Sequence, residues 1–247
     1  MIASLPMYDL RPNQGANDRF WQAIRRHLGQ GPDTLTRGGD LWDHWLADDL
    51  ILSQTCGYPY RARLHDRVTL VGTPVYGLPG CPPGHYNSVF VARADDARKT
   101  LQDFAGARFA YNESMSQSGW AAPMVHLRAL GLGFDDLVQT GGHRASALAV
   151  AEGRADIAAL DALTWKMTGR DDTFTAGLKE LGRTTPTPVL PYITAKQNDA
   201  APIFAAIEAA IGDLDVADRD MLSLRGIVEI PAEIYLAVPT PPGPGEE

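Results

Sequence analysis

Short apolar segments alternate with amphipathic segments along most of this chain. The apolar segments predict strands at residues 2–5, 50–54, 68–72, 87–93, 108–111 and 155–160. Helical periodicity and capping signals predict helices at residues 13–29, 40–45 and 144–152, and a further one that ends near Gly131. This order is typical of an α/β fold. Open α/β sheets bind ligands beyond the carboxyl ends of their strands, so we look for a site in the loops there.

The composition favours an ordinary globular protein of one domain or two small lobes. The 247 residues are 45% hydrophobic and carry a formal net charge of -8. Lys and Arg residues are scattered and form no stripe, so nucleic acid is not an expected partner. A small anion remains compatible with this charge because backbone N–H groups at a helix start can hold it without Lys or Arg.

No segment indicates export or membrane insertion. The first residues lack the basic and apolar regions of a signal peptide, and no window reaches the roughly 18 uninterrupted apolar residues of a membrane helix. We therefore expect a chain that does not span a membrane and, as given, stays in the cytoplasm unless a leader was removed. The sequence leaves open whether Cys56 and Cys81 are bonded, since it gives no distance between them.

A Ser-rich loop at residues 112–119 follows one predicted strand and precedes a predicted helix. Ser114, Ser116 and Ser118 place hydroxyl groups at alternate positions, and Ser118 is expected to cap the helix. Unpaired N–H groups and the helix dipole would hold an oxyanion there. A plain capped turn without a ligand explains the same pattern. The loop is not a nucleophile elbow, because Ser116 stands where that motif has Gly.

Three further loops carry candidate residues. His143 directly precedes a predicted helix and is either a donor to an anion or a capping residue at the surface. Asp161 ends a predicted strand and is either an acceptor for a ligand or a helix cap. Gly57 would let a ligand approach the backbone, and Tyr58 would supply an aromatic wall or a hydroxyl.

Common cofactor and metal motifs are missing from the sequence. There is no phosphate-binding loop of the P-loop type, no dinucleotide fingerprint, no H-E-x-x-H and no C-x-x-C, and the six His residues are dispersed. We therefore expect no cofactor, no metal and no catalytic residue.

Taken together, several segments resemble the phosphate/phosphonate-binding family of ABC-transporter substrate-binding proteins. The matching stretches occur in the family's order and cover roughly residues 1–195: 3–9, 54–59, 71–76, 86–88, 112–119, 142–143 and 155–161. The resemblance implies an α/β, two-lobed fold of the type II periplasmic-binding-protein kind, with two hinge crossings and the ligand in the cleft. The first lobe would comprise residues 1–88 and 192–247, the second 89–191, and residues 239–247 would be a flexible tail.

The resemblance also implies roles for the candidate residues. Ser116, Ser118 and Gly119 would cradle the anion, and His143 and Asp161 would be polar contacts of the second lobe. Tyr8, Gly57 and Tyr58 would form the wall of the first lobe. The implied ligand is a small tetrahedral oxyanion (phosphonate, phosphate or phosphite). The implied partner is an ABC-transporter permease, and the family that the chain resembles is periplasmic.

Two other functions fit the same scaffold. One is an enzyme similar to menaquinone-pathway enzymes that act on chorismate-derived substrates, for which His143, Asp161 and Glu113 are the available acids or bases. The other is a sensor that reports ligand occupancy to a partner protein. Because no paired acid and base is evident, binding is the leading interpretation.

Overall fold

The chain folds into two compact α/β units. The computed structural model describes residues 1–246, so the last residue of the expected flexible tail, Glu247, lies outside the described part. The first unit comprises Met1–His85 and Pro188–Ala237, and the second comprises Tyr86–Thr187 and residues 238–246. The mobility of the tail and the lobe boundaries expected from the sequence remain predictions.

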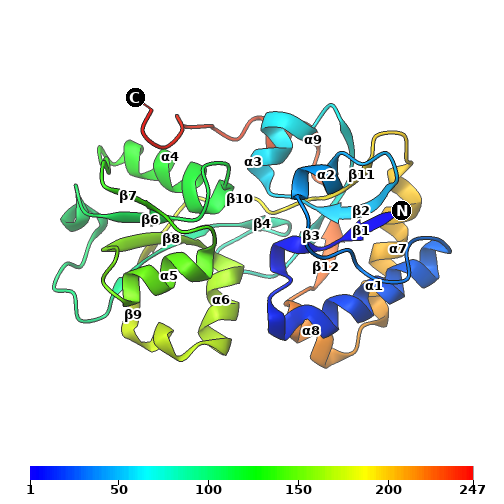
Figure 1. The fold of residues 1–247 in the computed structure, drawn as a ribbon, viewed down its shortest axis with the longest axis horizontal. Coiled ribbons are helices and arrows are strands. Elements are labelled where there is room, and N and C mark those ends of the chain that lie inside the picture. The colour runs from blue at the N-terminus through cyan, green and yellow to red at the C-terminus, as the bar shows by residue number, and fades with distance from the viewer. Residues whose placement is uncertain (247) are drawn as a thin grey trace. The chain divides into compact units, whose positions relative to one another are not determined.

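The first unit is built on a five-stranded mixed sheet, seen in Figure 1. The strands run in the order β1 (Ile2–Ser4), β2 (Leu50–Gln54), β11 (Tyr192–Ala195), β3 (Val68–Val75) and β12 (Gly226–Val228). β1 is parallel to β2, whereas β11 is antiparallel to both of its neighbours. The helices are η1 (Pro6–Tyr8), η2 (Arg11–Asn13), α1 (Gln14–Leu28), α2 (Leu41–Trp45), α3 (Gly57–Pro59), η3 (Tyr60–Leu64), α7 (Ala200–Asp213), α8 (Val216–Leu222) and α9 (Ala232–Leu236).

Local sequence explains the boundaries of α1 and α2. In α1, Phe20, Trp21 and Ile24 are almost fully buried, and each such side chain stabilises the fold by roughly 1.5–3 kcal/mol. Gly29 ends this helix in the left-handed conformation, with φ 73°. The side chain of Asp40 accepts from Trp42 N–H and caps α2, as the sequence predicted.

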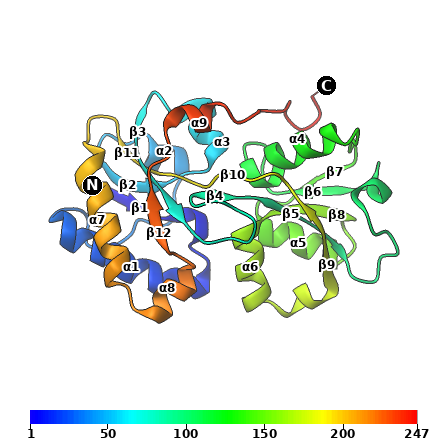
Figure 2. The same ribbon diagram turned by 180° about the vertical axis from the view of Figure 1, so that it is seen from behind.

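The second unit has its own five-stranded mixed sheet. Its order is β7 (Leu137–Gln139), β6 (Phe109–Tyr111), β8 (Ile157–Asp161), β5 (Ser88–Arg93) and β9 (Leu178–Arg183). Its helices are η4 (Leu101–Phe104), η5 (Gln117–Ala121), α4 (Ala122–Ala129), α5 (His143–Ala151), α6 (Ala162–Asp171) and η6 (Thr173–Gly177). Figures 1 and 2 show α4 on one face of the sheet and α5 and α6 on the other. A separate pair joins β4 (His85–Tyr86) to β10 (Thr187–Pro188).

The topology of the second sheet determines which loops meet. β6 and β8 are adjacent and parallel, so their carboxyl ends lie at the same edge. The chain leaves β6 into the Ser-rich loop and leaves β8 at Asp161. β7 is also parallel to β6, and the chain beyond it reaches the start of α5 at His143. Three loops far apart in sequence therefore converge.

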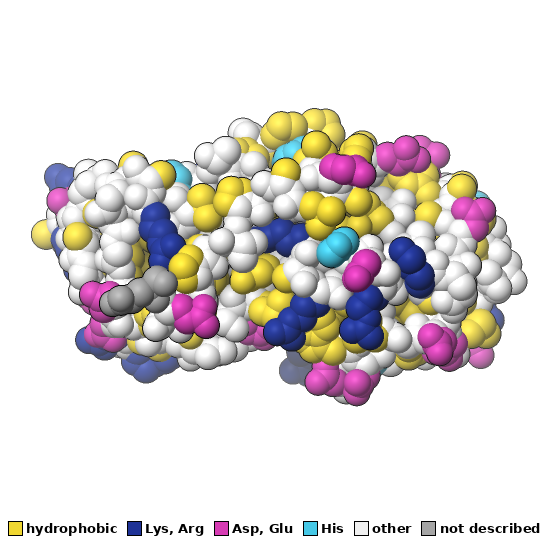
Figure 3. Space-filling view, turned by 90° about the horizontal axis from the view of Figure 1, so that it is seen from above, with side chains coloured by type: hydrophobic (Ala, Val, Ile, Leu, Met, Phe, Trp, Pro, Cys, Tyr) yellow, Lys and Arg dark blue, Asp and Glu magenta, His cyan; other side chains and the backbone are white. Residues whose placement is uncertain are grey.

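The surface agrees with the scattered charge pattern of the sequence. On the face shown in Figure 3, acidic and basic side chains are interspersed with apolar ones. Among residues 1–246, no helix is both long enough and apolar enough to cross a membrane.

Candidate functional site

The helix after the Ser-rich loop begins with a tight cap at Ser116. Its side chain accepts from Gly119 N–H at 3.0 Å, and its carbonyl accepts from Ala121 N–H at 2.9 Å. The first turn is the π-helical segment η5, which continues directly into α4. The expectation that Ser118 caps this helix was wrong. Ser116 does so because its extended backbone turns its hydroxyl toward the N–H three residues ahead.

Ser118 instead pairs with His143. Its Oγ lies 3.1 Å from His143 Nε2, and the other ring nitrogen, Nδ1, accepts from the main-chain N–H of Asp161 at 3.4 Å. Burial lowers the pKa of His143 to about 4, and a main-chain contact with Ala159 opposes this shift. The imidazole is therefore neutral at neutral pH. The sequence did not indicate this position between two loops, and the role of His143 as an anion contact stays a prediction.

Asn112 and Gly119 complete the cluster. The side-chain amide of Asn112 lies 3.5 Å from His143 Nε2, and its Oδ1 is buried without a hydrogen bond in the described structure. A Cβ built on Gly119 would stand 1.8 Å from that oxygen and 3.2 Å from His143 Cε1. Gly119 is thus required by its protein neighbours, whatever the ligand. Asn112 was not predicted as a site residue, since nothing in the loop pattern indicates this contact.

Asp161 is the last residue of β8 and is almost fully buried. Its Oδ1 accepts from Thr164 N–H at 2.8 Å, so its side chain caps α6. This is one of the two roles that the sequence left open. The adjoining main chain is paired with β5, where Asp161 stands opposite Ser88.

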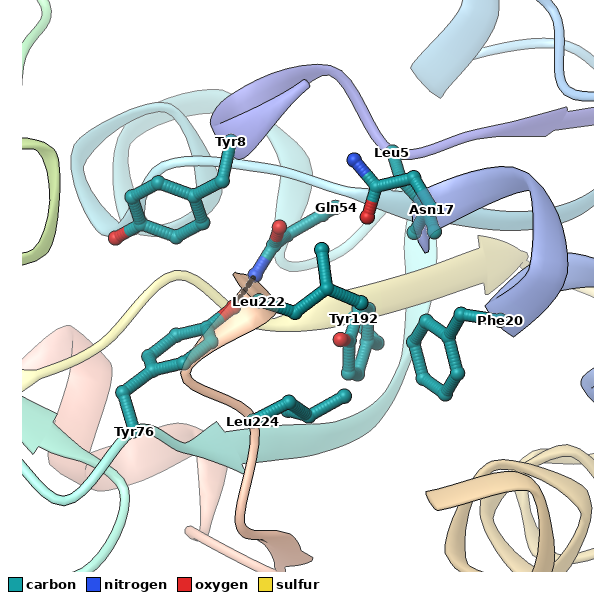
Figure 4. A pocket seen from close by; sticks show the side chains of 9 residues that line it. All are labelled: Leu5, Tyr8, Asn17, Phe20, Gln54, Tyr76, Tyr192, Leu222 and Leu224. Carbon is teal, nitrogen blue, oxygen red and sulfur yellow. Dashed lines mark hydrogen bonds between the residues drawn. The ribbon is translucent and has the colours of Figure 1, made fainter. Parts of the chain in front are cut away.

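In the first unit, Tyr8 lies beside Tyr76, with ring centroids 5.3 Å apart. Gln54 Nε2 donates to Tyr76 Oη at 3.1 Å (Figure 4). The same nitrogen donates to the carbonyl of Leu190 at 3.0 Å. Tyr8, Gln54 and Tyr76 line a cavity of about 20 Å³, which has room for about one water molecule. Gln54 and Tyr76 were not predicted as site residues, although a buried Gln that ends a strand is a usable signal.

Gly57 and Tyr58 do not line this cavity. Gly57 opens α3, and a Cβ there would meet the Pro188 carbonyl and the Tyr235 ring at an ordinary 3.8 Å. Tyr58 is half-buried under the guanidinium of Arg61, which lies 4.5 Å from the ring centroid. The structure therefore brings Ser116, Ser118, Gly119, His143 and Asp161 together in the second unit. Tyr8, Gly57 and Tyr58 belong to the first unit.

The described residues contain neither a disulfide bond nor a group of side chains arranged to bind a metal ion. Cys56 and Cys81, both within the described residues, form no disulfide. Across residues 1–246, no group of three or more His, Cys, Asp or Glu side chains is arranged to hold a metal ion.

Solved structures show the fold of the chain. PhnD1 from Prochlorococcus marinus, in complex with methylphosphonate, is 17% identical with a TM-score of 0.72, covering 95% of this chain and 94% of that one. A binding-protein component of an ABC phosphonate transporter from Pseudomonas aeruginosa is 14% identical with a TM-score of 0.70, covering 92% and 80%. XAC2383 from Xanthomonas citri, bound to ATP, is 14% identical with a TM-score of 0.67, covering 96% of both chains. The predicted type II periplasmic-binding-protein fold is therefore confirmed.

The family is shown by the sequence itself. A comparison with curated protein sequences found no match. Residues 47–230 match the family model described as ABC transporter, phosphonate, periplasmic substrate-binding protein, which covers most of the chain and confirms the predicted resemblance. This chain belongs to the phosphonate-binding family of periplasmic substrate-binding proteins of ABC transporters.

Proposed function

We propose that the chain binds a small tetrahedral oxyanion (phosphonate, phosphate or phosphite) as the solute-binding component of an ABC transporter. The observation that carries this proposal is the helix start at Ser116, where the Ser118 hydroxyl and the His143 imidazole lie 3.1 Å apart. A helix start offers unpaired N–H groups and a partial positive charge. The family match and the methylphosphonate bound by PhnD1 support the same ligand class.

The proposed site uses neutral donors instead of cations. The segment Gln117–Ala121 contains no charged residue, and burial keeps His143 neutral. Neutral donors can hold an anion even though the chain carries a net charge of -8. They also leave no unpaired cation in the site when the ligand is absent.

The roles of individual residues follow from this arrangement. Ser116 and Gly119 shape the helix start, and Ser118 is the hydroxyl that meets the anion. Asp161 remains a proposed polar contact, with its Oδ1 already bound to Thr164 N–H. Tyr8, Gly57 and Tyr58 remain proposed ligand contacts from the first unit, and hinge closure on the ligand would involve both units.

Calorimetric titration of the whole chain tests the proposal. Methylphosphonate, phosphate, phosphite and sulfate would be titrated separately, and a thermal-shift measurement would follow each ligand, since a ligand that binds only the native state raises stability. Ser118→Ala should weaken binding at least about tenfold. The matched control is Ser114→Ala, an exposed Ser of the same loop, which should leave affinity unchanged. If none of the phosphorus oxyanions binds the wild-type chain, the proposed function is wrong.

A further inference from the structure

The Pro-rich C-terminal segment, residues 238–246, belongs to the second unit, although the helix before it belongs to the first. The boundary between the units falls after Ala237, so the chain passes from one unit to the other there, in addition to the passages after His85 and Thr187. Figures 1 and 2 show the segment as an extended red trace that continues from α9. It lies outside residues 47–230, which match the family model.

Trp120 anchors the C-terminal segment to the second unit. Its indole Nε1 donates to the carbonyl of Pro242 at 3.0 Å. Its ring contacts the ring of Tyr111, with centroids 5.1 Å apart, and both side chains are buried. Pro241, the residue before the acceptor, is buried as well. A buried indole N–H needs an acceptor, and segments with the P-x-x-P spacing of residues 239–242 dock on aromatic surfaces in this way.

A turn closes the end of the segment. Gly243 N–H donates to Glu246 Oε2 at 3.0 Å, and Glu246 N–H donates to the carbonyl of Gly243 at 3.1 Å. Between them, Pro244 and Gly245 are the residue pair that a type II turn favours, and Gly245 takes the left-handed conformation, with φ 79°. Four of the nine residues 238–246 are Pro, which reduces the conformational entropy that the segment loses when it docks.

We propose that residues 238–246 are a latch that docks on Trp120 and restrains the movement of one unit relative to the other. A fully extended chain spans at most about 3.6 Å per residue, so the five residues 238–242 keep Ala237 within roughly 18 Å of Pro242 while the latch is docked. Release of the latch removes this limit and leaves the passages after His85 and Thr187 to connect the units. The latch is independent of the proposed function, because its docking involves no ligand.

Substitutions on both sides of the contact test the docking in the full chain. Trp120→Phe keeps an aromatic ring and removes the indole N–H, and Pro241→Asp places a charge at the buried position of the segment without touching Trp120. Nitrogen-15 relaxation of the amides at the end of the segment should give order parameters near about 0.85 in the wild-type chain and below about 0.6 in both variants. Trp165→Phe is the matched control, because it removes an indole donor bonded to Glu180 in the same unit and should leave the segment ordered. Order parameters below about 0.6 in the wild-type chain would show the flexible tail expected from the sequence and overturn the proposal.

Residual dipolar couplings of the amides in the two five-stranded sheets measure the restraint itself. A single alignment should fit both sheets in the wild-type chain, whereas Pro241→Asp should require a separate alignment for each unit, because the released units reorient independently. A synthetic peptide of residues 238–246, added to Pro241→Asp, should shift the indole resonance of Trp120 and leave the two alignments separate, since the peptide is not joined to α9. A single alignment for Pro241→Asp, or its recovery with the free peptide, would overturn the latch.

Discussion

The side-chain amide of Asn112 occupies the space beside Gly119 in which any other residue would carry its Cβ. The Oδ1 atom stands 1.8 Å from that position, far inside the distance at which two atoms can coexist. This contact joins the end of β6 to the first turn of the following helix. The geometry of the proposed anion site therefore depends on a pair of residues, one of which has no side chain.

Gly119→Ala should destabilise the fold by about 1–3 kcal/mol, because the added methyl group must displace a buried amide. Asn112→Ala in the same chain should restore part of that loss by vacating the space. Urea denaturation of the two single variants and the double variant would measure both effects. Wild-type stability in Gly119→Ala would contradict the predicted clash.

Ser116→Ala should lower mainly the stability of the fold, whereas Ser118→Ala should lower mainly the affinity for the oxyanion. Ser116 caps the helix, so its loss should cost about 1 kcal/mol of stability. Ser118 makes no cap, so its loss should leave thermal stability near that of the wild type and reduce oxyanion affinity. Differential scanning calorimetry beside titration calorimetry would show whether the two effects separate. The assignment fails if Ser118→Ala is the more destabilising variant.

Two substitutions at Asp161 separate its cap from its charge. Asn caps helices as well as Asp does, so Asp161→Asn should keep stability, while Asp161→Ala should lose about 1 kcal/mol. Binding of an amine-bearing phosphonate should drop in Asp161→Asn much more than binding of phosphate if the carboxylate contacts an ammonium. Equal affinities for both ligands before and after the change would restrict Asp161 to the cap.

His44 offers a stabilising substitution in the first unit. Its side chain is buried on α2, and Nδ1 has no hydrogen-bond partner in the described structure. An unsatisfied buried polar atom costs about 1–3 kcal/mol. His44→Leu should therefore match or exceed wild-type stability in chemical denaturation and leave oxyanion affinity unchanged. A clear loss of stability would mean that Nδ1 is satisfied by an ordered water.

Acid should destabilise the chain partly through His143. Its native pKa of about 4 lies below the ordinary 6.5, so the unfolded state binds more protons between these values and stability falls as pH falls through that range. The contribution is no more than about 3 kcal/mol, because solvent access to the residue reduces it. In His143→Gln, the free energy of unfolding should depend less on pH over this range. His126, whose pKa burial also lowers, keeps the same slope in both proteins and serves as the internal reference.

The sequence by itself determined the elements whose signals are local. The apolar run at residues 50–54 is strand β2, the cap at Asp40 starts α2, and Gly29 ends α1, because periodicity, capping and left-handed glycine act within a few residues. Ordered motifs also sufficed for the family, since the matched model spans residues 47–230. The family could therefore be predicted from the sequence before the fold was known.

Tertiary structure decided what each candidate side chain does. Both Ser116 and Ser118 precede the same helix, and only the backbone geometry of the loop assigns the cap to one and the His143 contact to the other. The contacts of His143 with Ser118 and with Asp161 depend on β6 lying parallel to both β7 and β8, which brings distant loops to one edge. Hydrogen-bond partners that are separated by tens of residues leave no local pattern in the sequence. The sequence therefore identifies candidate site residues, and the fold determines the role of each one.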